Sequence, residues 1–367
     1  MAATFGKCFQ ITVIGESHGT GIGVVVDGCP AGLELSETDV QEELDKRKPG
    51  QSLLTTQRKE TDKARILTGV FRGKTTARPI TIWIDNSDAI SANYDEIRNT
   101  PRPGHADYPA RIKFGGFEDY RGGGAFSGRM TACLVMAGAV AKKLIRLRKV
   151  ECIAHITNIG KVGISSQVTD EDIRKKTCSS PVRCADDKAG KKMAEVIESA
   201  RNNGDSVGGI VEARINGLPA GIGEPFFDSF ESVLSHLVFS IPAAKGVEFG
   251  SGFAGSSKTG FENNDRYEID KKGGISTASN NSGGILGGLT TGMPVVYRVA
   301  FKPASSIARE QVTASLLTRK RVPLRVKGRH DPCIAIRAVP VVEAVSAIAC
   351  AELLIASQKL PRVVANG

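Results

Sequence analysis

Three short segments of the sequence combine histidine with glycine, acids or hydroxyls, the residue types that move protons and bind anions. They read "GESHG" (15–19), "RPGHAD" (102–107) and "KGRHDP" (327–332). Glycine-flanked polar residues directly after an apolar run are typical of a strand that delivers side chains to a site. An imidazole titrates near neutral pH, so it can give or take a proton at little energetic cost. His18 and His105 are therefore the candidates for proton transfer.

Two further histidines stand in apolar surroundings. His155 alternates with apolar residues in "ECIAHITNIG", which favours a strand, and His236 lies in "VLSHLVF", which favours an apolar helix. We predict that both are structural.

A glycine-rich segment, "RGGGAFSGR" (121–129), resembles an anion cradle. Backbone N–H groups at the start of the helix that follows would point at a bound anion, and the helix dipole would add to the attraction. "KPASS" (302–306) and "KGRHDP" are further short basic segments that suit phosphate. Each alone is more often a solvated loop. Together they predict a cationic pocket for at least two anionic groups.

Composition narrows the class of protein. The 367 residues contain 49 Lys and Arg against 39 Asp and Glu, a net charge of +10, and only 5% aromatic residues. A nucleic-acid binder usually has a continuous basic run or stacking aromatics, so an anionic metabolite is the better partner. We see no apolar stretch of about 20 residues, no signal peptide, and no C-x-x-C pair among eight cysteines. We expect a reduced, cytoplasmic protein without membrane, nucleic-acid or metal binding.

The elements that must position these residues are readable from periodicity and caps. Helices are predicted after Ser36 up to Pro49 and Gly50, and over 129–149, about 187–203, and 340–359 with Pro340 in the first turn. Between them lie β-rich runs such as "ITVI", "IGVVVDG", "ARILTGV", "PITIWID", "GGIVEARING" and "MPVVYRVAF". Apolar helices between alternating strands argue for a layered α+β fold with the helices covered by sheet.

Taken together, "GESHGTGIGVVVDGCPAG" (15–32), the segment 102–131 and "GRHDPCIAIRAVPVVEAVSAIACAELL" (328–354) resemble the three signature regions of the chorismate synthase family, in order and with its spacing. The resemblance covers essentially the whole chain, so we expect one domain over residues 1–367. It implies a β-α-β sandwich with central apolar helices between antiparallel sheets, assembled as a homotetramer.

The resemblance also implies an activity, namely a lyase that forms chorismate from 5-enolpyruvylshikimate 3-phosphate by anti-1,4 elimination of phosphate, in the shikimate pathway to aromatic amino acids. The cofactor is reduced FMN, although the reaction has no net redox change. Whether the chain reduces FMN itself with NADPH is left open. The alternatives are a non-catalytic protein that binds anionic ligands and a flavin-dependent oxidoreductase.

Roles follow for single residues from the same resemblance. His18 would be the acid near the departing phosphate, His105 would protonate the reduced flavin or balance its charge, and Asp331 would assist the final proton removal near N(5) of the flavin. Ser17 and Ser127 would hydrogen-bond within this proton relay.

Binding residues are implied in the same way. The positions expected at FMN are Ala125, Phe126, Ser127, Pro242, Ala243, Gly287, Lys302, Pro303, Ala304, Ser305, Ser306 and Arg329. The substrate would contact Arg47 and Arg129, with Lys48 as a further candidate. Leu53 stands where many members have a second substrate-binding arginine, and Arg58 or Lys48 would have to compensate.

Overall fold

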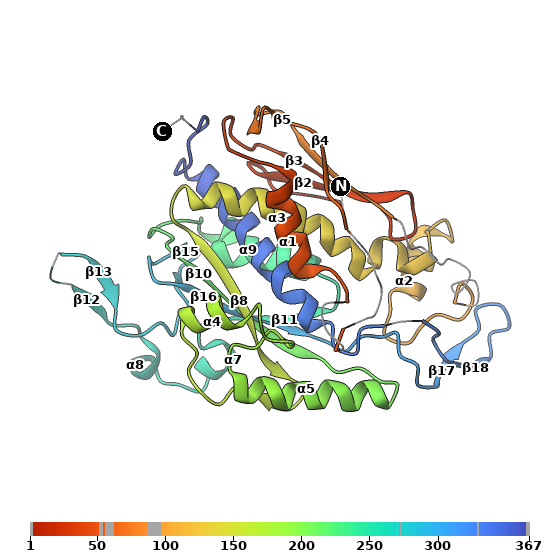
Figure 1. The fold of residues 1–367 in the computed structure, drawn as a ribbon. Coiled ribbons are helices and arrows are strands. Elements are labelled where there is room, and N and C mark those ends of the chain that lie inside the picture. Colours follow the sequence, from red (N-terminus) through yellow and green to blue (C-terminus); the bar gives the residue numbers. More distant parts are fainter. Residues whose placement is uncertain are drawn as a thin grey trace.

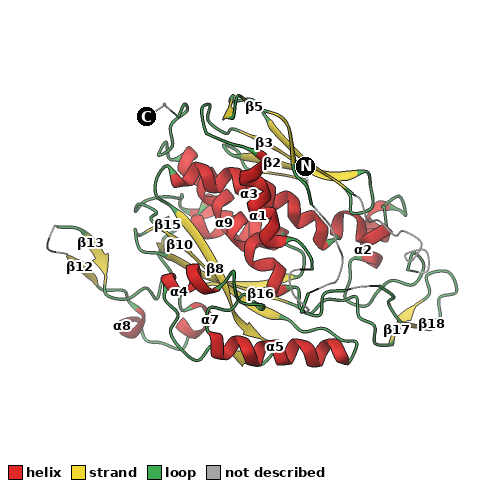
Figure 2. Ribbon diagram, viewed as in Figure 1, coloured by secondary structure: helices red, strands yellow, loops and turns green. Residues whose placement is uncertain are grey.

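Two antiparallel sheets of five strands each enclose a layer of helices (Figure 1 and Figure 2). The computed structural model describes residues 3–50, 54–55, 62–86, 97–269, 271, 273–328 and 330–364. Three positions singled out by the resemblance, Leu53, Arg58 and Arg329, lie outside the described residues.

Both sheets form from the runs whose alternation predicted strands. The first has the order β1 (Thr4–Phe5), β2 (Gln10–Gly15), β3 (Gly21–Asp27), β7 (Ile80–Asp85) and β4 (Arg65–Thr68). The second has the order β11 (Ala244–Phe249), β16 (Val295–Phe301), β10 (Gly209–Asn216), β8 (Glu151–Ile159) and β9 (Val162–Gly163). In β10 and β16 buried residues alternate with half-buried ones, because one face of the sheet packs on the helices.

The central layer consists of α1 (Glu37–Arg47), α3 (Thr131–Arg146) and α9 (Ala335–Ala356). Helix α3 packs against β2 and β3, while α9 packs against β8 and β10. The two helices touch closely at Gly138, where an added Cβ would lie 2.4 Å from Cβ of Ala344. This arrangement confirms the predicted β-α-β sandwich.

Shorter elements surround these layers. The other helices are α2 (Asp107–Phe114), α4 (Asp170–Lys176), α5 (Asp187–Asn202), α6 (Phe230–Ser240), α7 (Gly252–Gly255) and α8 (Gly260–Asn263), with 3₁₀ turns at Arg121–Phe126, Gly128–Met130 and Phe226–Asp228. Four small hairpins pair β5 (Val70–Phe71) with β6 (Lys74–Thr75), β12 (Tyr267–Ile269) with β13 (Ile275–Thr277), β14 (Ile285–Leu286) with β15 (Leu289–Thr290), and β17 (Gln311–Ala314) with β18 (Arg321–Leu324). Helix α5 lies against β8 and β9 on the side away from the helical layer (Figure 1).

The last helix differs from its prediction. It begins at Ala335, so Pro340 lies inside the helix instead of in its first turn. A proline there removes one backbone hydrogen bond, and the packing of α9 between the sheets outweighs that loss. By length and composition α9 could also cross a bilayer, but 89% of its most apolar 18-residue window is buried inside the fold. It is the core helix of this molecule.

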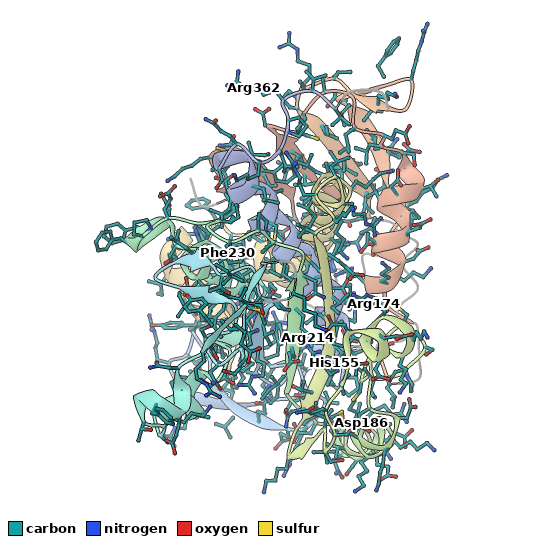
Figure 3. The ribbon with its side chains drawn as sticks, turned by 90° about the vertical axis from the view of Figure 1, so that its left-hand side faces the viewer. His155, Arg174, Asp186, Arg214, Phe230 and Arg362 are labelled. Carbon is teal, nitrogen blue, oxygen red and sulfur yellow. The ribbon has the colours of Figure 1, made fainter. Side chains whose placement is uncertain are left out.

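The two histidines predicted to be structural lie on the expected element types. His155 is fully buried on β8 (Figure 3), with Nε2 3.8 Å from Oε1 of Glu212. That oxygen accepts a hydrogen bond from Nε of Arg214 at 3.1 Å. His236 lies on α6, edge-on to the ring of Phe5 at 5.3 Å between centroids.

Candidate active site

A cavity of about 660 Å³ opens where segments from both ends and the middle of the chain meet. Cavities of roughly 300–1,000 Å³ are typical of small-molecule and cofactor sites. The wall is built mainly from residues 102–106, 122–131, 239–245, 301–306 and 330–341. Most of these are loops at the ends of strands and helices, which is where binding residues usually lie.

Most of the predicted site residues line this one cavity. They are Arg47, His105, Ala125, Phe126, Ser127, Arg129, Pro242, Ala243, Lys302, Pro303, Ala304, Ser305, Ser306 and Asp331.

His105 is held by an acid from the next turn of the chain. Its Nδ1 lies 2.6 Å from Oδ1 of Asp107, the first residue of α2. A carboxylate can only accept, so we assign the ring proton to Nδ1. Burial opposes ionisation of Asp107, yet hydrogen bonds from Arg102 and His105 hold its pKa well below the ordinary value. His105 itself lines the cavity, and its Nε2 lies 3.5 Å from where a Cβ on Gly123 would stand.

Arg102 stabilises the pair of His105 and Asp107. Its Nε and Nη2 donate to the two oxygens of Asp107 at 2.8 Å each, and its Nη1 donates to Oγ of Ser306 at 2.9 Å. The guanidinium is buried, and its planar fork ties the His105 loop to the segment after β16.

The triple glycine forms a thin wall between the two candidate histidines. Gly122, Gly123 and Gly124 have φ of 61°, 84° and 51°, a conformation that other residues adopt with strain. A Cβ at Gly122 would lie 2.2 Å from the ring of His18 and 2.9 Å from Oγ of Ser17. His18 and Ser17 do not line the cavity themselves. They pack behind Gly122, which does.

The segment after the glycines leads into α3, as the sequence predicted. Oγ of Ser127 accepts from the backbone N–H of Arg129 at 3.3 Å and so caps the turn before the helix.

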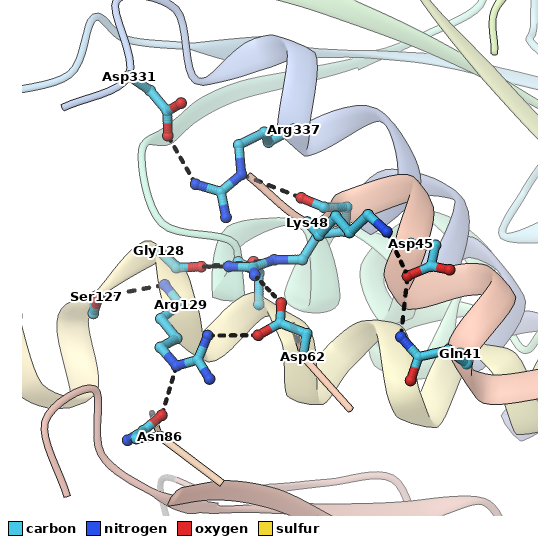
Figure 4. A network of polar contacts seen from close by, with 12 residues as sticks. Gln41, Asp45, Lys48, Asp62, Asn86, Ser127, Gly128, Arg129, Asp331 and Arg337 are labelled. Atoms are coloured by element: carbon cyan, nitrogen blue, oxygen red, sulfur yellow. Dashed lines mark hydrogen bonds and ion pairs between the residues drawn. The ribbon is translucent and has the colours of Figure 1, made fainter. Parts of the chain in front are cut away.

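Arg47 and Arg129 converge on one buried carboxylate, that of Asp62 (Figure 4). Nη1 of Arg47 lies 3.2 Å from Oδ2, and Nη1 of Arg129 lies 2.8 Å from Oδ1. Arg47 also donates to the backbone oxygen of Gly128 at 2.8 Å and to Oγ1 of Thr131 at 3.1 Å. Burial opposes ionisation of Asp62, but the two guanidinium charges hold its pKa below the ordinary value. The pair of arginines thus shares one negative charge.

Asp331 faces the cavity beside a third arginine. Its Oδ2 accepts from Nη1 of Arg337 at 2.8 Å, and Nε of Arg337 donates to the backbone oxygen of Arg47 at 3.2 Å (Figure 4). The start of α9 is therefore tied to the end of α1.

Lys302 also lines the cavity, together with hydroxyl groups of the segment 302–306. Nζ of Lys302 donates to Oγ of Ser305 at 2.7 Å, and Oγ of Ser305 donates to the backbone oxygen of Gly104 at 2.6 Å. The backbone N–H of Lys302 donates to the carbonyl of Ala243 at 3.0 Å. Burial, assisted by the charge of Lys245, lowers the pKa of Lys302.

Besides Ser17 and His18, two further predicted residues, Gly287 and Lys48, do not line the cavity. Gly287 lies in the β14–β15 turn, whose Gly288 carbonyl accepts from the N–H of Phe230 at the start of α6. The other end of this 11-residue helix lines the cavity, roughly 16 Å away at about 1.5 Å per residue. Lys48 follows α1 and pairs with Asp45 at 3.1 Å, outside the cavity lining (Figure 4).

Sequence reasoning missed Arg102, Asp62, Asn86 and Arg337. Arg102 could have been found, because it stands three residues before His105 in "RPGHAD". Asp62 and Asn86 carry no local signal, since their partners are distant in the chain. Arg337 lies only six residues after its partner Asp331, within the segment 328–354, so it too could have been found.

Comparisons with known proteins identify the family of this chain. The profile of the chorismate synthase family matches residues 9–355. A chorismate synthase of Methanocella arvoryzae is 51% identical over 352 residues, which is 96% of this chain and 94% of the relative. One from Dehalococcoides mccartyi is 47% identical over 365 residues, 99% of this chain and all of the relative. A solved structure described as the crystal structure of chorismate synthase superposes with a TM-score of 0.76 at 26% identity, covering 96% of this chain and 93% of that one. With its fold and signature loops in place, this chain belongs to the chorismate synthase family.

Proposed function

We propose that this chain, a carbon–oxygen lyase that forms chorismate in the shikimate pathway, acts by anti-1,4 elimination of phosphate from 5-enolpyruvylshikimate 3-phosphate with reduced FMN and no net redox change. The observation that carries the proposal is the convergence of His105, Arg129, Lys302 and Asp331 on one cavity. That substrate carries a phosphate and two carboxylates, and FMN adds another phosphate. A cationic cavity is suited to both.

The residues present fit FMN. The cavity has the size of a cofactor site, and one wall offers Lys302 with the hydroxyls of Ser305 and Ser306 for a phosphate or ribityl chain. The ring of Phe126 is 40% exposed at the cavity, a flat apolar surface that suits an isoalloxazine. When bound in its reduced form, FMN supplies electron density to the substrate ring and a basic atom for its departing proton.

The chain's own groups then have distinct tasks. Arg47 and Arg129, which both pair with Asp62, bind the acidic groups of the substrate. His18, behind Gly122, gives a proton to the departing phosphate, with Ser17 beside it. Nδ1 of His105 keeps its proton and donates it in a hydrogen bond to Asp107, so Nε2 is the atom that exchanges protons with the cofactor. Asp331, oriented by Arg337, assists the removal of the ring proton.

We further propose a cytoplasmic homotetramer. The β12–β13 hairpin projects from the molecule (Figure 2), and its Tyr267, Ile269 and Ile275 are between 67% and 76% exposed. Apolar side chains gathered on a projecting element favour a protein interface. Light scattering of the purified protein measures the assembly, and a monomer would contradict it.

An anaerobic assay tests the reaction. Purified protein is given 5-enolpyruvylshikimate 3-phosphate and FMN with either NADPH or dithionite, and phosphate, chorismate and reductant are quantified. We expect one phosphate per chorismate and reductant consumption that stops once the flavin is reduced. Consumption of reductant in proportion to product would favour a flavin-dependent oxidoreductase. Activity with NADPH alone would assign flavin reduction to this chain, and activity only with dithionite would require an external reductase.

A further inference from the structure

Asn86 stands between two parts of the site that are far apart in the chain. It follows β7 directly, and its backbone N–H donates to the carbonyl of Thr20 at 3.1 Å. That carbonyl ends the β2–β3 loop, residues 16–20, which carries Ser17 and His18. Asn86 itself does not line the cavity.

The amide nitrogen of Asn86 donates hydrogen bonds to backbone carbonyls of the β2–β3 loop. Nδ2 lies 3.0 Å from the backbone oxygen of Glu16, 3.1 Å from that of Ser17 and 2.9 Å from that of Gly19. Three acceptors converge on a group with two N–H bonds, so at least one bond is shared. Only a donor with more than one proton satisfies this position, and an oxygen there would face three carbonyl oxygens.

The amide oxygen of the same side chain orients Arg129. Oδ1 accepts from Nε of Arg129 at 2.7 Å, while Nη1 of Arg129 pairs with Asp62 at 2.8 Å (Figure 4). The neutral contact at Nε and the charged contact at Nη1 therefore both help to set the guanidinium plane.

We propose that Asn86 is a positioning residue that couples the loop bearing His18 to the substrate arginine Arg129. The proposal rests on the function proposed above, in which His18 acts as acid and Arg129 binds substrate. The amide nitrogen of Asn86 binds the backbone of the loop that bears His18, and its amide oxygen binds Nε of Arg129. The distance between His18 and Arg129 is therefore held constant.

Two substitutions of Asn86 distinguish its contact with the loop from its contact with Arg129. Asn86→Asp keeps an oxygen acceptor for Arg129 but replaces the donor with an oxygen that repels the loop carbonyls. Asn86→Ala removes both contacts. Asn280 offers a matched control, because its Nδ2 donates to the backbone oxygen of Pro294 at 2.8 Å outside the cavity lining. Asn280→Asp and Asn280→Ala are therefore measured alongside.

We expect N86D to lose about 10²-fold in kcat, since a misplacement of about 1 Å can cost that much, while the Kd of the substrate changes less than about threefold. N86A should show the same loss in kcat and, in addition, a Kd raised about tenfold, because a charge-assisted contact no longer orients Arg129. FMN affinity should stay the same in both. The Asn280 variants should keep kcat and Kd and change only the melting temperature.

Other outcomes overturn the proposal. If the Asn86 variants match the Asn280 variants in kcat and Kd, Asn86 serves stability alone. If N86D raises the substrate Kd as much as N86A, the amide oxygen does not orient Arg129. If N86D, N86A and the milder N86S all fail to fold, Asn86 belongs to the fold and not to the site. A wild-type chain without chorismate-forming activity would instead contradict the proposed function.

Discussion

Nδ1 of His105 and Oδ1 of Asp107 lie 2.6 Å apart, and the acid receives three further hydrogen bonds from Arg102, two from its guanidinium and one from its backbone N–H. The pair belongs to one short motif, since Asp107 opens α2 two residues after the histidine. An acid in this position selects the ring tautomer and stabilises the imidazolium whenever it forms.

Asp107→Asn should therefore lower kcat by about 10²-fold without weakening FMN binding, because the amide can no longer select the tautomer. A matched control is Asp205→Asn, which alters an exposed pair with Arg309 at 3.5 Å. Since the pKa of Asp107 is depressed, its ionised form stabilises the fold at neutral pH. That stabilisation is lost as pH falls below the ordinary carboxyl value of about 3.9. Equal kcat in the two variants would contradict the assigned role.

His18→Ala tests the acid behind the glycine wall. We expect turnover to fall on the order of 10²-fold, since a general acid contributes typically that much or more. FMN and substrate should still bind, because Lys302 and Arg129 remain in place. His155→Ala, at a fully buried position outside the cavity lining, should keep turnover and lower the melting temperature. Normal turnover in the His18 variant would disprove its acid role.

Arg129→Ala should weaken substrate binding about tenfold and leave the FMN affinity unchanged, because a charge-assisted contact to an acidic group is lost. Asp62 would keep Arg47 as its partner. Arg298→Ala, which removes a pair with Glu248 at 3.0 Å, is the control and should change neither constant. Isothermal titration with each ligand measures both. An unchanged substrate constant with a lowered melting temperature would assign Arg129 to stability alone.

Lys142 joins three helices through a buried triad, with Nζ 2.6 Å from Oε2 of Glu43 and 2.7 Å from Oε2 of Glu343. Lys142→Met should destabilise the fold by about 3–5 kcal/mol, because it leaves two carboxylates facing each other in a buried site. Lys175→Met breaks only an exposed pair with Glu171 and should cost at most about 0.5 kcal/mol. Urea titrations of both variants at pH 7 give these values.

The triad also predicts a pH dependence. Burial raises the pKa of Glu43, but Lys142 and Lys46 outweigh it and hold the value at about 2. The ionised Glu43 therefore stabilises the fold fully above its unfolded pKa of about 4.3, and this contribution disappears as pH falls towards 2. The difference in melting temperature between the wild type and the Glu43→Gln variant should therefore shrink as the pH falls from 5 to 2. A constant difference would show that Glu43 is not ionised in the fold.

Oxidised FMN should bind more tightly in the presence of substrate than alone. Both ligands would share one cationic cavity, and the substrate would cover the flavin and exclude water. Fluorescence titrations of FMN with and without substrate measure the coupling. Equal affinities would mean that the two sites are independent.

Local features of the sequence determined the elements and the chemistry. Ser36 with Asp39 specified the start of α1, because a capping box is formed within four residues. The run 187–203 matched α5 within one residue, since its period and its final "NNG" are local. The motifs around His18 and His105 suggested proton transfer for the same reason, whereas the role expected of Asp331 came from the family resemblance. Short-range geometry is contained in neighbouring residues.

Tertiary structure alone decided which of these groups meet. Asp62 pairs with Arg47 and Arg129, which are 15 and 67 residues away in the chain. Asn86 contacts the β2–β3 loop, which is about as far from it in the chain as Arg129 is from Asp62. Gly287 was expected at the cofactor but lies at the far end of α6, because the path of the intervening helix separates it from the cavity. Pro340 signalled a helix start, yet packing between two sheets extended α9 past it. Such contacts depend on the packing of whole layers, and that energy is not encoded in any local stretch of sequence.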